Sequence, residues 1–236
     1  MAAKEVQCVV TRKQWLTPTV FELVFQAEPA FSFQAGQFIS VVVPGAGPGG
    51  RNLRRAYSIA SAPENPDVEL CIKLVEGGPG TTYLNSLNVG DHFTGFAPSG
   101  FFTYKTPSER SVFFISTGTG IAPFRSMILS EAYRAAPPKN ATLILGVTYA
   151  KELLYDSEMS AIPDLTWVKT LSRDTEPPES CLKGRLTQYF FGLDGSLNWQ
   201  DADYYLCGNG AMIQEVTTFL TEKGVPKNQI HKEKYY

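Results

Sequence analysis

The strands that this sequence predicts change character near residue 105, and this change constrains the fold more than any other feature. Before it, strands are short and alternate polar with apolar residues, as in Val68–Val75. After it, strands are continuous apolar runs such as Ser111–Thr117, and helical stretches lie between several of them. Alternation marks a strand with one buried face, whereas continuous apolar strands belong to sheets that are covered on both faces. The two patterns therefore require two different sheets.

The first hundred residues predict an antiparallel β-barrel. Short predicted strands follow one another at intervals of roughly ten residues, separated by glycine and proline, as in small closed antiparallel sheets. The turn at Ala62–Pro66, for example, places two prolines between two strands. The predicted strands are Val20–Phe25, Gln37–Val43, Ala56–Ala60 and Val68–Val75.

The second half predicts an α/β domain with a parallel sheet. Continuous apolar strands alternate with helical stretches, so both faces of the sheet would be covered. The polar segment Thr106–Arg110 separates the two halves, and we expect one domain in residues 1–104 and another in residues 105–236. The predicted strands are Ser111–Thr117, Ala141–Val147, Leu165–Leu171 and Asp203–Cys207, and the predicted helices include Pro123–Arg134 and Ala211–Lys223.

Histidine and cysteine are too few and too scattered for the common kinds of metal site. The two histidines, His92 and His231, exclude a three-histidine zinc site. The four cysteines contain no C-x-x-C pair, so the spacings of zinc knuckles and iron–sulfur ferredoxins are absent and no metal site is expected. The net charge of −2 also gives no sign of general nucleic-acid binding.

We expect the chain to be soluble and cytoplasmic. Its first residues lack the apolar core of a secretory signal peptide. The sequence has no apolar run that approaches the roughly 20 residues of a membrane-spanning helix, so no membrane span is predicted. In the cytoplasm the four cysteines stay reduced.

Two glycine-rich segments have the composition of phosphate-binding loops, and only one has the right surroundings. Gly45–Gly50 satisfies G-x-G-x-x-G, but no helix follows it and Pro48 lacks the amide that a phosphate would bind, so a surface hairpin is favoured. Ser116–Pro123 lies between an apolar strand and a helix, and Gly118 and Gly120 let a phosphate approach the backbone. The alternative is a plain strand-to-helix turn, because the third glycine of the dinucleotide fingerprint is absent.

A third segment combines groups that could hold a phosphate, an aromatic ring and a polar ring edge. Arg54–Ser61 places two arginines beside Tyr57 and Ser58 on a predicted barrel strand. After the next strand, Gly77–Leu84 has glycines before threonines at the start of a short predicted helix, which makes a second phosphate cradle. Alone, two such arginines are more often a surface pair, and the combination is what favours a site.

These elements, in this order, resemble the ferredoxin–NADP(+) reductase family, and the bacterial branch is closest. The matching motifs span the chain from the first strand to the final residue. The resemblance implies a two-domain fold, in which an antiparallel FAD-binding β-barrel is followed by an NADP-binding α/β domain with a parallel sheet. The motifs are R-x-Y-S at Arg55–Ser58, the loop Gly78–Thr81, the loop Gly118–Pro123, and C-G-x-x-x-M at Cys207–Met212.

The resemblance also implies roles for individual residues, with FAD and NADP(H) as cofactors. Hydride transfer between nicotinamide and flavin depends on positioning and electronic tuning, which fits a sequence without a histidine-based triad. The expected catalytic residues are Ser58, Cys207 and Tyr235. The expected FAD contacts are Arg55, Ala56, Tyr57, Ser58, Ile72, Lys73, Leu74, Gly80, Thr81, Tyr235 and Tyr236. The expected NADP contacts are Thr117, Gly118, Thr119, Gly120, Ser172, Arg173, Arg185, Cys207 and Gly208.

The choice of NADP over NAD rests on two loops that follow predicted strands. Ser172 and Arg173 follow one strand, and Arg185 lies in the next loop. Arginine and hydroxyl groups suit the 2′-phosphate of NADP, whereas an NAD site usually presents a carboxylate to the ribose hydroxyl. Asp174, beside Arg173, complicates this interpretation, and the alternative is a pair of solvated basic side chains.

Tyr235, Tyr236 and Cys207 each have a plainer alternative. Two tyrosines at a chain end could simply be frayed. The resemblance instead implies that the C-terminal tail returns to the flavin, with Tyr235 covering the ring and Tyr236 near the FAD adenine. Cysteine is often buried only for packing, but the position of Cys207 before Gly208 favours a place beside the nicotinamide.

The resemblance implies a flavoenzyme that transfers electrons between NADP(H) and a one-electron carrier, ferredoxin or flavodoxin, and we expect it to act as a monomer. Two alternatives share the fold: the reductase component of an oxygenase, and an NAD(P)H:flavin reductase, which releases its flavin. A non-catalytic flavin-binding regulator is a third. These four cysteines cannot supply the iron–sulfur domain that oxygenase reductases usually carry.

Overall fold

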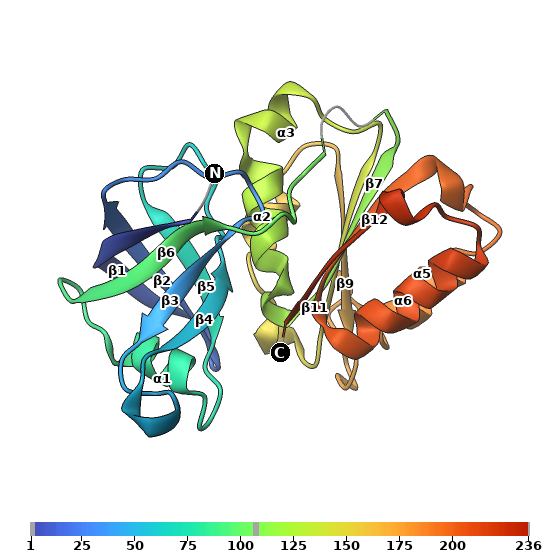
Figure 1. Cartoon of the computed structure of the whole chain (residues 1–236). Helices are drawn as coiled ribbons and strands as arrows, with labels where there is room; N and C mark the ends of the chain where they lie inside the picture. The colour runs from blue at the N-terminus through green and yellow to red at the C-terminus, as the bar shows by residue number, and fades with distance from the viewer. Residues whose placement is uncertain (1–2, 106–108, 236) are drawn as a thin grey trace. The chain divides into compact units, whose positions relative to one another are not determined.

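The chain folds into two units, each built around a six-stranded sheet (Figure 1). The computed structural model describes residues 3–105 and 109–235. The first unit contains the described part of Met1–Tyr104 together with Ala122–Glu131, and the second contains the described parts of Lys105–Ile121 and Ala132–Tyr236. Residues 106–108, which are part of the polar segment Thr106–Arg110 that the sequence predicts between the domains, lie outside the described residues.

The sheet of the first unit is antiparallel and closes on itself. Its order is β4-β3-β6-β1-β2-β5, and each neighbouring pair runs antiparallel. A bridge between Ile59, just past β4, and Leu70 on β5 joins the two edges, so the predicted antiparallel barrel is confirmed. The strands are β1 (Lys4–Thr17), β2 (Val20–Glu28), β3 (Phe38–Val43), β4 (Leu53–Ser58), β5 (Val68–Lys73) and β6 (His92–Ser99).

Two details of this barrel differ from the sequence prediction. Strands β1 and β6 were not predicted, because their alternating buried positions include Cys8 on β1 and Gly95 on β6 and give no long apolar pattern. The expectation that β5 has one buried face is wrong. Glu69 and Cys71, on its expected polar face, are also buried, with 7% and 8% exposure. A second layer therefore covers this face of β5, and its Arg125 side chain forms an ion pair with the Glu69 carboxylate.

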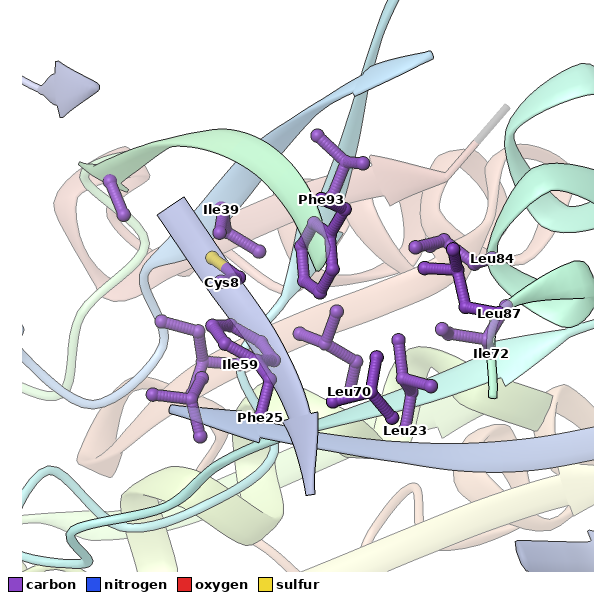
Figure 2. Close-up of a cluster of buried hydrophobic side chains, with 14 of the residues drawn as sticks. Cys8, Leu23, Phe25, Ile39, Ile59, Leu70, Ile72, Leu84, Leu87 and Phe93 are labelled. Atoms are coloured by element: carbon purple, nitrogen blue, oxygen red, sulfur yellow. The ribbon is translucent and has the colours of Figure 1, made fainter. Parts of the chain in front are cut away.

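The barrel core fixes helix α1 (Pro79–Ser86) in place. Figure 2 shows Leu84 of this helix and the following Leu87 beside Ile72. Burial of these leucines holds one face of α1 on the barrel, and its N-terminal turn is thereby positioned. Phe25 and Phe93 meet edge to face in the same core, with ring centroids 5.0 Å apart. The core also includes Cys8, Leu23, Ile39, Ile59 and Leu70.

The sheet of the second unit is parallel, as predicted. Its order is β10-β9-β8-β7-β11-β12, and each neighbouring pair runs parallel. The chain moves outward from β7 in one direction through β8 and β9, and later returns to place β11 on the other side of β7. The strands are β7 (Ser111–Thr117), β8 (Ala141–Val147), β9 (Leu165–Leu171), β10 (Leu182–Lys183), β11 (Ala202–Asn209) and β12 (Ile230–Tyr235).

Helices α5 (Leu186–Gly192) and α6 (Gly210–Glu222) enclose an aromatic cluster with this sheet. The ring centroid of Phe190 lies 5.1 Å from that of Trp199 and 6.0 Å from that of Phe219, in edge-to-face arrangements. The other helical segments of the unit are α3 (Glu131–Ala135), α4 (Asp156–Ser160) and the short 3₁₀ turns η2 (Gly118–Ile121), η3 (Ala150–Glu152), η4 (Trp199–Asp201) and η5 (Lys227–Gln229). Across residues 3–105 and 109–235, the helices are all too short or too polar to span a bilayer.

Helix α2 (Ala122–Leu129) belongs to the first unit, although it follows the first strand of the second in sequence. The sequence predicts one helix over Pro123–Arg134, and the structure interrupts it at Ser130. The amide and the hydroxyl of Ser130 both donate to the Met127 carbonyl, at 3.2 and 2.7 Å, which tightens the last turn and ends the helix. The next residues form the separate helix α3.

Candidate functional site

Strand β4 carries the predicted flavin motif at an edge of the barrel sheet. Arg55 and Ala56 are exposed, Tyr57 is half-buried, and Ser58 is buried. Burial raises the pKa of Tyr57 to about 12, against a smaller lowering effect of the Arg55 charge. Tyr57 therefore presents a ring and an uncharged hydroxyl at neutral pH, beside a permanent positive charge on Arg55.

Gly80 packs so closely on this motif that a side chain there has no space. A Cβ atom at Gly80 would lie 2.5 Å from the Tyr57 hydroxyl oxygen and 2.8 Å from Cγ of Arg55. The start of α1 is thus in direct contact with both side chains. The structure brings together three residues that the sequence predicts to bind FAD.

The first turn of α1 presents backbone amides to its surroundings. The first hydrogen bond within the helix runs from the Thr82 amide to the Gly78 carbonyl, at 2.9 Å, so the amides of Gly80 and Thr81 precede the bonded part of the helix. The Thr81 hydroxyl accepts a hydrogen bond from the Val75 amide and lies within donating distance of the Gly78 carbonyl, both at 3.2 Å. Thr81 therefore closes the loop with its side chain, and its amide is the group that can meet an anion.

These groups fit the pyrophosphate of a dinucleotide. Arg55 supplies charge, the helix start supplies amides, and Gly80 allows the backbone to approach closely. Of the predicted contacts on and after β5, Ile72 has its side chain in the barrel core, Lys73 is exposed and Leu74 is half-buried. Because β5 is the other edge strand, we expect the Ile72–Leu74 segment to contact a flavin through its backbone.

Lys13 on β1 holds the opposite end of α1. Its ammonium group donates hydrogen bonds to the carbonyl of Asn85 and, at 3.1 Å, to that of Leu87. Positive charge is favoured at the C-terminal end of a helix, so Lys13 stabilises the helix whose other end forms the phosphate cradle. The sequence carries no local signal for this role, because Lys13 and Asn85 are 72 positions apart.

In the second unit, the carboxyl ends of β7 and β11 meet where the strand order reverses. Open α/β sheets bind their ligands at such a point. The loop after β7 begins with Thr117 and Gly118, and β11 ends in Cys207, Gly208 and Asn209. The sheet topology therefore places two predicted NADP-binding segments side by side.

The two segments are packed backbone to backbone. A Cβ atom at Gly120 would lie 2.5 Å from the Cys207 carbonyl oxygen, and one at Gly208, where φ is +119°, would lie 2.5 Å from the Thr117 hydroxyl. The Asn209 amide donates to that hydroxyl at 2.8 Å. The predicted residues gathered here are Thr117, Gly118, Thr119, Gly120, Cys207 and Gly208.

Cys207 is fully buried and linked to Tyr235, the last described residue. Burial raises the pKa of the Cys207 thiol far above its usual range, and the Glu233 charge adds to this. The thiol is hydrogen-bonded to the Tyr235 side chain. The structure thus brings two of the predicted catalytic residues together, and a neutral buried thiol is not poised to act as a nucleophile.

The other predicted NADP residues lie at the carboxyl end of β9. Ser172 and Arg173 have exposed side chains, and their amides donate to carbonyls at the end of β8, at 3.0 and 3.1 Å. The Gly184 amide donates to the Leu171 carbonyl at 2.9 Å, which brings Arg185 to the same end of the sheet. Two exposed guanidinium groups and a hydroxyl suit a phosphate monoester.

Asp174, which complicated the choice of coenzyme, has a structural partner. Its Oδ2 atom accepts a hydrogen bond from the Ala150 amide, at 3.1 Å, and so fixes the turn that follows β8. A carboxylate engaged in this way is less suited to the ribose hydroxyl contact that NAD sites use.

The predicted site residues are divided between the two units. The described FAD residues of β4, β5 and α1 lie in the first unit, and the described NADP residues lie in the second. Tyr235 lies on β12 in the second unit, where its register partner is Asn209. Tyr236 lies outside the described residues.

Two domain families match the chain. Residues 7–104 match the oxidoreductase FAD-binding domain, and residues 114–218 match the oxidoreductase NAD-binding domain. Ferredoxin–NADP reductase B of Sorangium cellulosum is 34% identical over 93% of this chain and 93% of that protein. The phenol 2-monooxygenase reductase component DmpP of a Pseudomonas species is 31% identical over 94% of this chain, which spans 63% of that longer protein.

A solved structure agrees with the fold. The ferredoxin NADP+ reductase of Neisseria gonorrhoeae, determined with bound FAD and NADP, covers the whole of both chains with a TM-score of 0.83 at 22% identity. The domain matches make this chain an oxidoreductase with an FAD-binding and a nicotinamide-dinucleotide-binding domain. With a relative 34% identical along nearly its full length, the chain belongs to the ferredoxin–NADP reductase family.

Proposed function

We propose that this chain transfers electrons between NADP(H) and a one-electron carrier protein, ferredoxin or flavodoxin. The observation that carries the proposal is a pair of glycine cradles, one in each unit: Gly80 against Arg55 and Tyr57, and Gly120 against Cys207. Bound FAD would supply the chemistry, because it accepts a hydride from a nicotinamide and releases the two electrons one at a time. The chain's own residues bind and orient the two cofactors.

The residues of the first unit would bind the flavin and set its surroundings. Arg55 would neutralise pyrophosphate charge together with the amides at the start of α1. Tyr57 would offer a neutral phenol, because its pKa of about 12 keeps the proton in place. Ser58, buried at the end of β4, would offer a hydroxyl that can donate or accept one hydrogen bond as the flavin changes its protonation.

The residues of the second unit would bind the dinucleotide. Gly118 and Gly120 would admit the pyrophosphate to the backbone, and the neutral thiol of Cys207 would support the nicotinamide by shape. The guanidinium groups of Arg173 and Arg185 favour NADP over NAD. Substituting Arg173→Ala removes one charged hydrogen-bonding group, for which we expect kcat/KM for NADPH to fall about 10- to 100-fold, with little change for NADH.

The matched control for this substitution is Lys139→Ala. Lys139 is also exposed, and it precedes β8 at the amino end of the same sheet, so the change in net charge is the same. A loss of NADPH selectivity in both variants would contradict a local role for Arg173. An equal loss of NADPH and NADH turnover in Arg173→Ala would contradict a contact with the 2′-phosphate.

Exposed basic side chains support an acidic carrier as the electron acceptor. Arg54 lies on β4 beside the flavin motif, with its guanidinium carbon 3.6 Å from the centre of the Phe96 ring. Arg51, also exposed, precedes the same strand. Positive charge near the flavin-binding strand would attract acidic carriers and increase their association rate at low salt.

A second candidate function is the reductase component of an oxygenase, which the similarity to DmpP favours. The four cysteines of this chain lie on three different strands and in a loop and are all buried, so this part of the sequence does not hold an iron–sulfur cluster of its own. The carrier would then be a separate iron–sulfur protein. The two candidate functions differ in the electron acceptor, and both require the same binding of FAD and of the nicotinamide dinucleotide.

Anaerobic titration of the purified protein with NADPH tests the proposal. We expect a yellow protein with one FAD per chain, bleaching of the flavin by NADPH, and subsequent reduction of ferredoxin or flavodoxin. Loss of flavin on gel filtration would indicate a flavin reductase instead. A bound flavin that NADPH leaves oxidised would indicate a non-catalytic flavin-binding protein.

A further inference from the structure

Helix α2 is attached to the barrel of the first unit by apolar and polar contacts. Its Phe124 packs against Phe102, with ring centroids 5.9 Å apart. The Met127 methyl group fills the space beside Gly36, where a Cβ atom would lie only 2.4 Å from it. Apolar contacts of this kind keep a helix on a surface but are not directional.

Arg125 adds directional contacts between the same helix and the barrel. It donates a hydrogen bond to the Ala60 carbonyl at 2.9 Å, and it forms an ion pair with Oε2 of Glu69. The side chains are almost buried, with 11% exposure for Arg125 and 9% for Glu69. A charged pair at this burial is costly to break, because the remaining partner would be left as a poorly solvated charge.

Both partners of Arg125 lie in the flavin-binding part of the barrel. Ala60 is two residues beyond Ser58, and Glu69 is three residues before Ile72 on β5. These partners are also joined to each other, since the Ala60 amide donates to the Glu69 carbonyl at 2.8 Å. Arg125 therefore contacts the barrel next to the segments of β4 and β5 that carry the predicted flavin contacts.

The Glu69 carboxylate is fixed from a second side. Its Oε1 atom lies 3.5 Å from the Arg12 guanidinium, which also pairs with Glu22 at 3.1 Å. Gln14 donates to the same Glu22 at 2.8 Å, and Glu22 is only 3% exposed. With Glu69 held in this network, the Arg125 side chain has one well-defined docking geometry.

Helix α2 begins at Ala122, directly after the turn Gly118–Ile121 that we expect to bind the NADP pyrophosphate. A rotation or slide of α2 therefore moves the end of that turn through a single peptide bond. We propose that Arg125, through Glu69 and Ala60, is a positioning residue for flavin reduction by the nicotinamide dinucleotide. It fixes the rotation of α2 and thereby the end of the dinucleotide-binding turn, which is joined directly to the helix. This inference rests on the function proposed above.

The effect expected on loss of Arg125 is specific. Phe124 and Met127 keep α2 on the barrel, so the fold and the FAD site remain. The helix loses its directional contact, and a misplacement of about 1 Å can slow a hydride transfer roughly 100-fold. The expected result is therefore slow flavin reduction in a protein that still holds its FAD.

The test compares Arg125→Met and Arg125→Lys with a matched control in the FAD-loaded protein. Arg134→Met is the control, because Arg134 is exposed on the next helix, α3. Three quantities are measured: FAD per chain, hydrogen exchange of the amides of residues 124–129, and the single-turnover rate of flavin reduction by NADPH. A fourth variant, Glu69→Gln, and its combination with Arg125→Met show whether the two residues act together.

Four results together support the proposal. In Arg125→Met, amides 124–129 exchange at least tenfold faster and flavin reduction slows 10- to 100-fold at unchanged FAD content. Arg125→Lys recovers part of the rate, because it keeps a donor for Glu69. The double variant is no slower than Arg125→Met. Arg134→Met matches the unmodified protein in all three measurements.

The opposite results overturn the inference and are distinct from failure of the proposed function. Unchanged reduction in Arg125→Met, or a loss of rate that only follows a loss of FAD, shows that Arg125 has no positioning role. Should Arg125→Met fail to fold, the same criteria apply to Arg125→Lys. If NADPH does not reduce the flavin of the unmodified protein, the proposed function itself fails, and this inference fails with it.

Discussion

Gly120 offers a sharp test of the dinucleotide site, because replacing it with alanine adds one methyl group against rigid backbone. The added Cβ would lie 2.5 Å from the Cys207 carbonyl oxygen, 2.7 Å from its carbonyl carbon and 2.9 Å from Cα of Gly208. Ordinary contact begins at 3.4 Å, so the turn and the end of β11 must separate by about 0.9 Å. No flexible side chain is available at these positions to absorb the change.

The expected result of Gly120→Ala is a selective loss of flavin reduction. Overpacking of this kind typically costs 1–3 kcal/mol of stability, so the protein still folds. A displacement of nearly 1 Å at the proposed pyrophosphate and nicotinamide contacts should slow single-turnover reduction by NADPH about 100-fold. FAD content should change little, because the predicted FAD contacts on β4, β5 and α1 belong to the first unit and, of the described contacts, only Tyr235 lies beside the displaced end of β11.

The control is Gly192→Ala, the same substitution in the same unit. Gly192 is the exposed last residue of α5, and a Cβ atom there would meet nothing within 4 Å. This variant should reduce its flavin at the normal rate and unfold at the same or a slightly higher denaturant concentration. A normal reduction rate in Gly120→Ala would refute the site, and loss of FAD together with the rate would show that the damage is global.

Two other predictions concern the barrel. Lys13→Met removes the cation at the C-terminal end of α1. This substitution should lower the free energy of unfolding by about 1 kcal/mol and weaken FAD binding to the apoprotein a few-fold. Unchanged affinity in a flavin titration would contradict the link between the two helix ends. The pKa of Tyr57 is about 12 in the folded protein and near 10 in the unfolded chain, so the free energy of unfolding should fall as the pH rises from 10 to 12. When unfolding is measured at pH 9, 10 and 11, this fall should be shallower in Tyr57→Phe.

The two sheets could be predicted because burial leaves a periodic pattern in the sequence. Continuous apolar strands such as Ser111–Thr117 identify a sheet covered on both faces, and the parallel sheet is confirmed. Alternation on β5 correctly identified the core face that holds Leu70 and Ile72. It could not identify the covering of the opposite face, where Glu69 is buried, because the covering residue Arg125 is 56 positions away.

The candidate site residues were found by a different kind of signal. Motifs such as Arg55–Ser58 and Gly118–Gly120 are local and carry their own spacing, so they can be recognised without a fold. Their roles toward FAD and NADP remain predictions. Lys13 and Arg125 act through partners distant in sequence, so no local spacing marks them, and only the folded chain shows which carbonyl or carboxylate they meet.

The two glycine-rich loops show why a motif must be judged by the space around it. Gly45, Gly49 and Gly50 all have positive φ, yet a Cβ atom at any of them would meet nothing within 4 Å. Gly47 is crowded only by the backbone of Arg51 and Asn52 in its own turn. There glycine serves the shape of a turn, whose only helical part is the 3₁₀ turn Pro48–Gly50 ahead of strand β4. Gly120 has an ordinary φ and no space, because the Cys207 backbone occupies the position of its side chain. A phosphate-binding site requires glycine for a lack of space, at a point where two backbones approach each other at the end of parallel strands. The pattern G-x-G-x-x-G alone does not distinguish such a glycine from one that only shapes a turn.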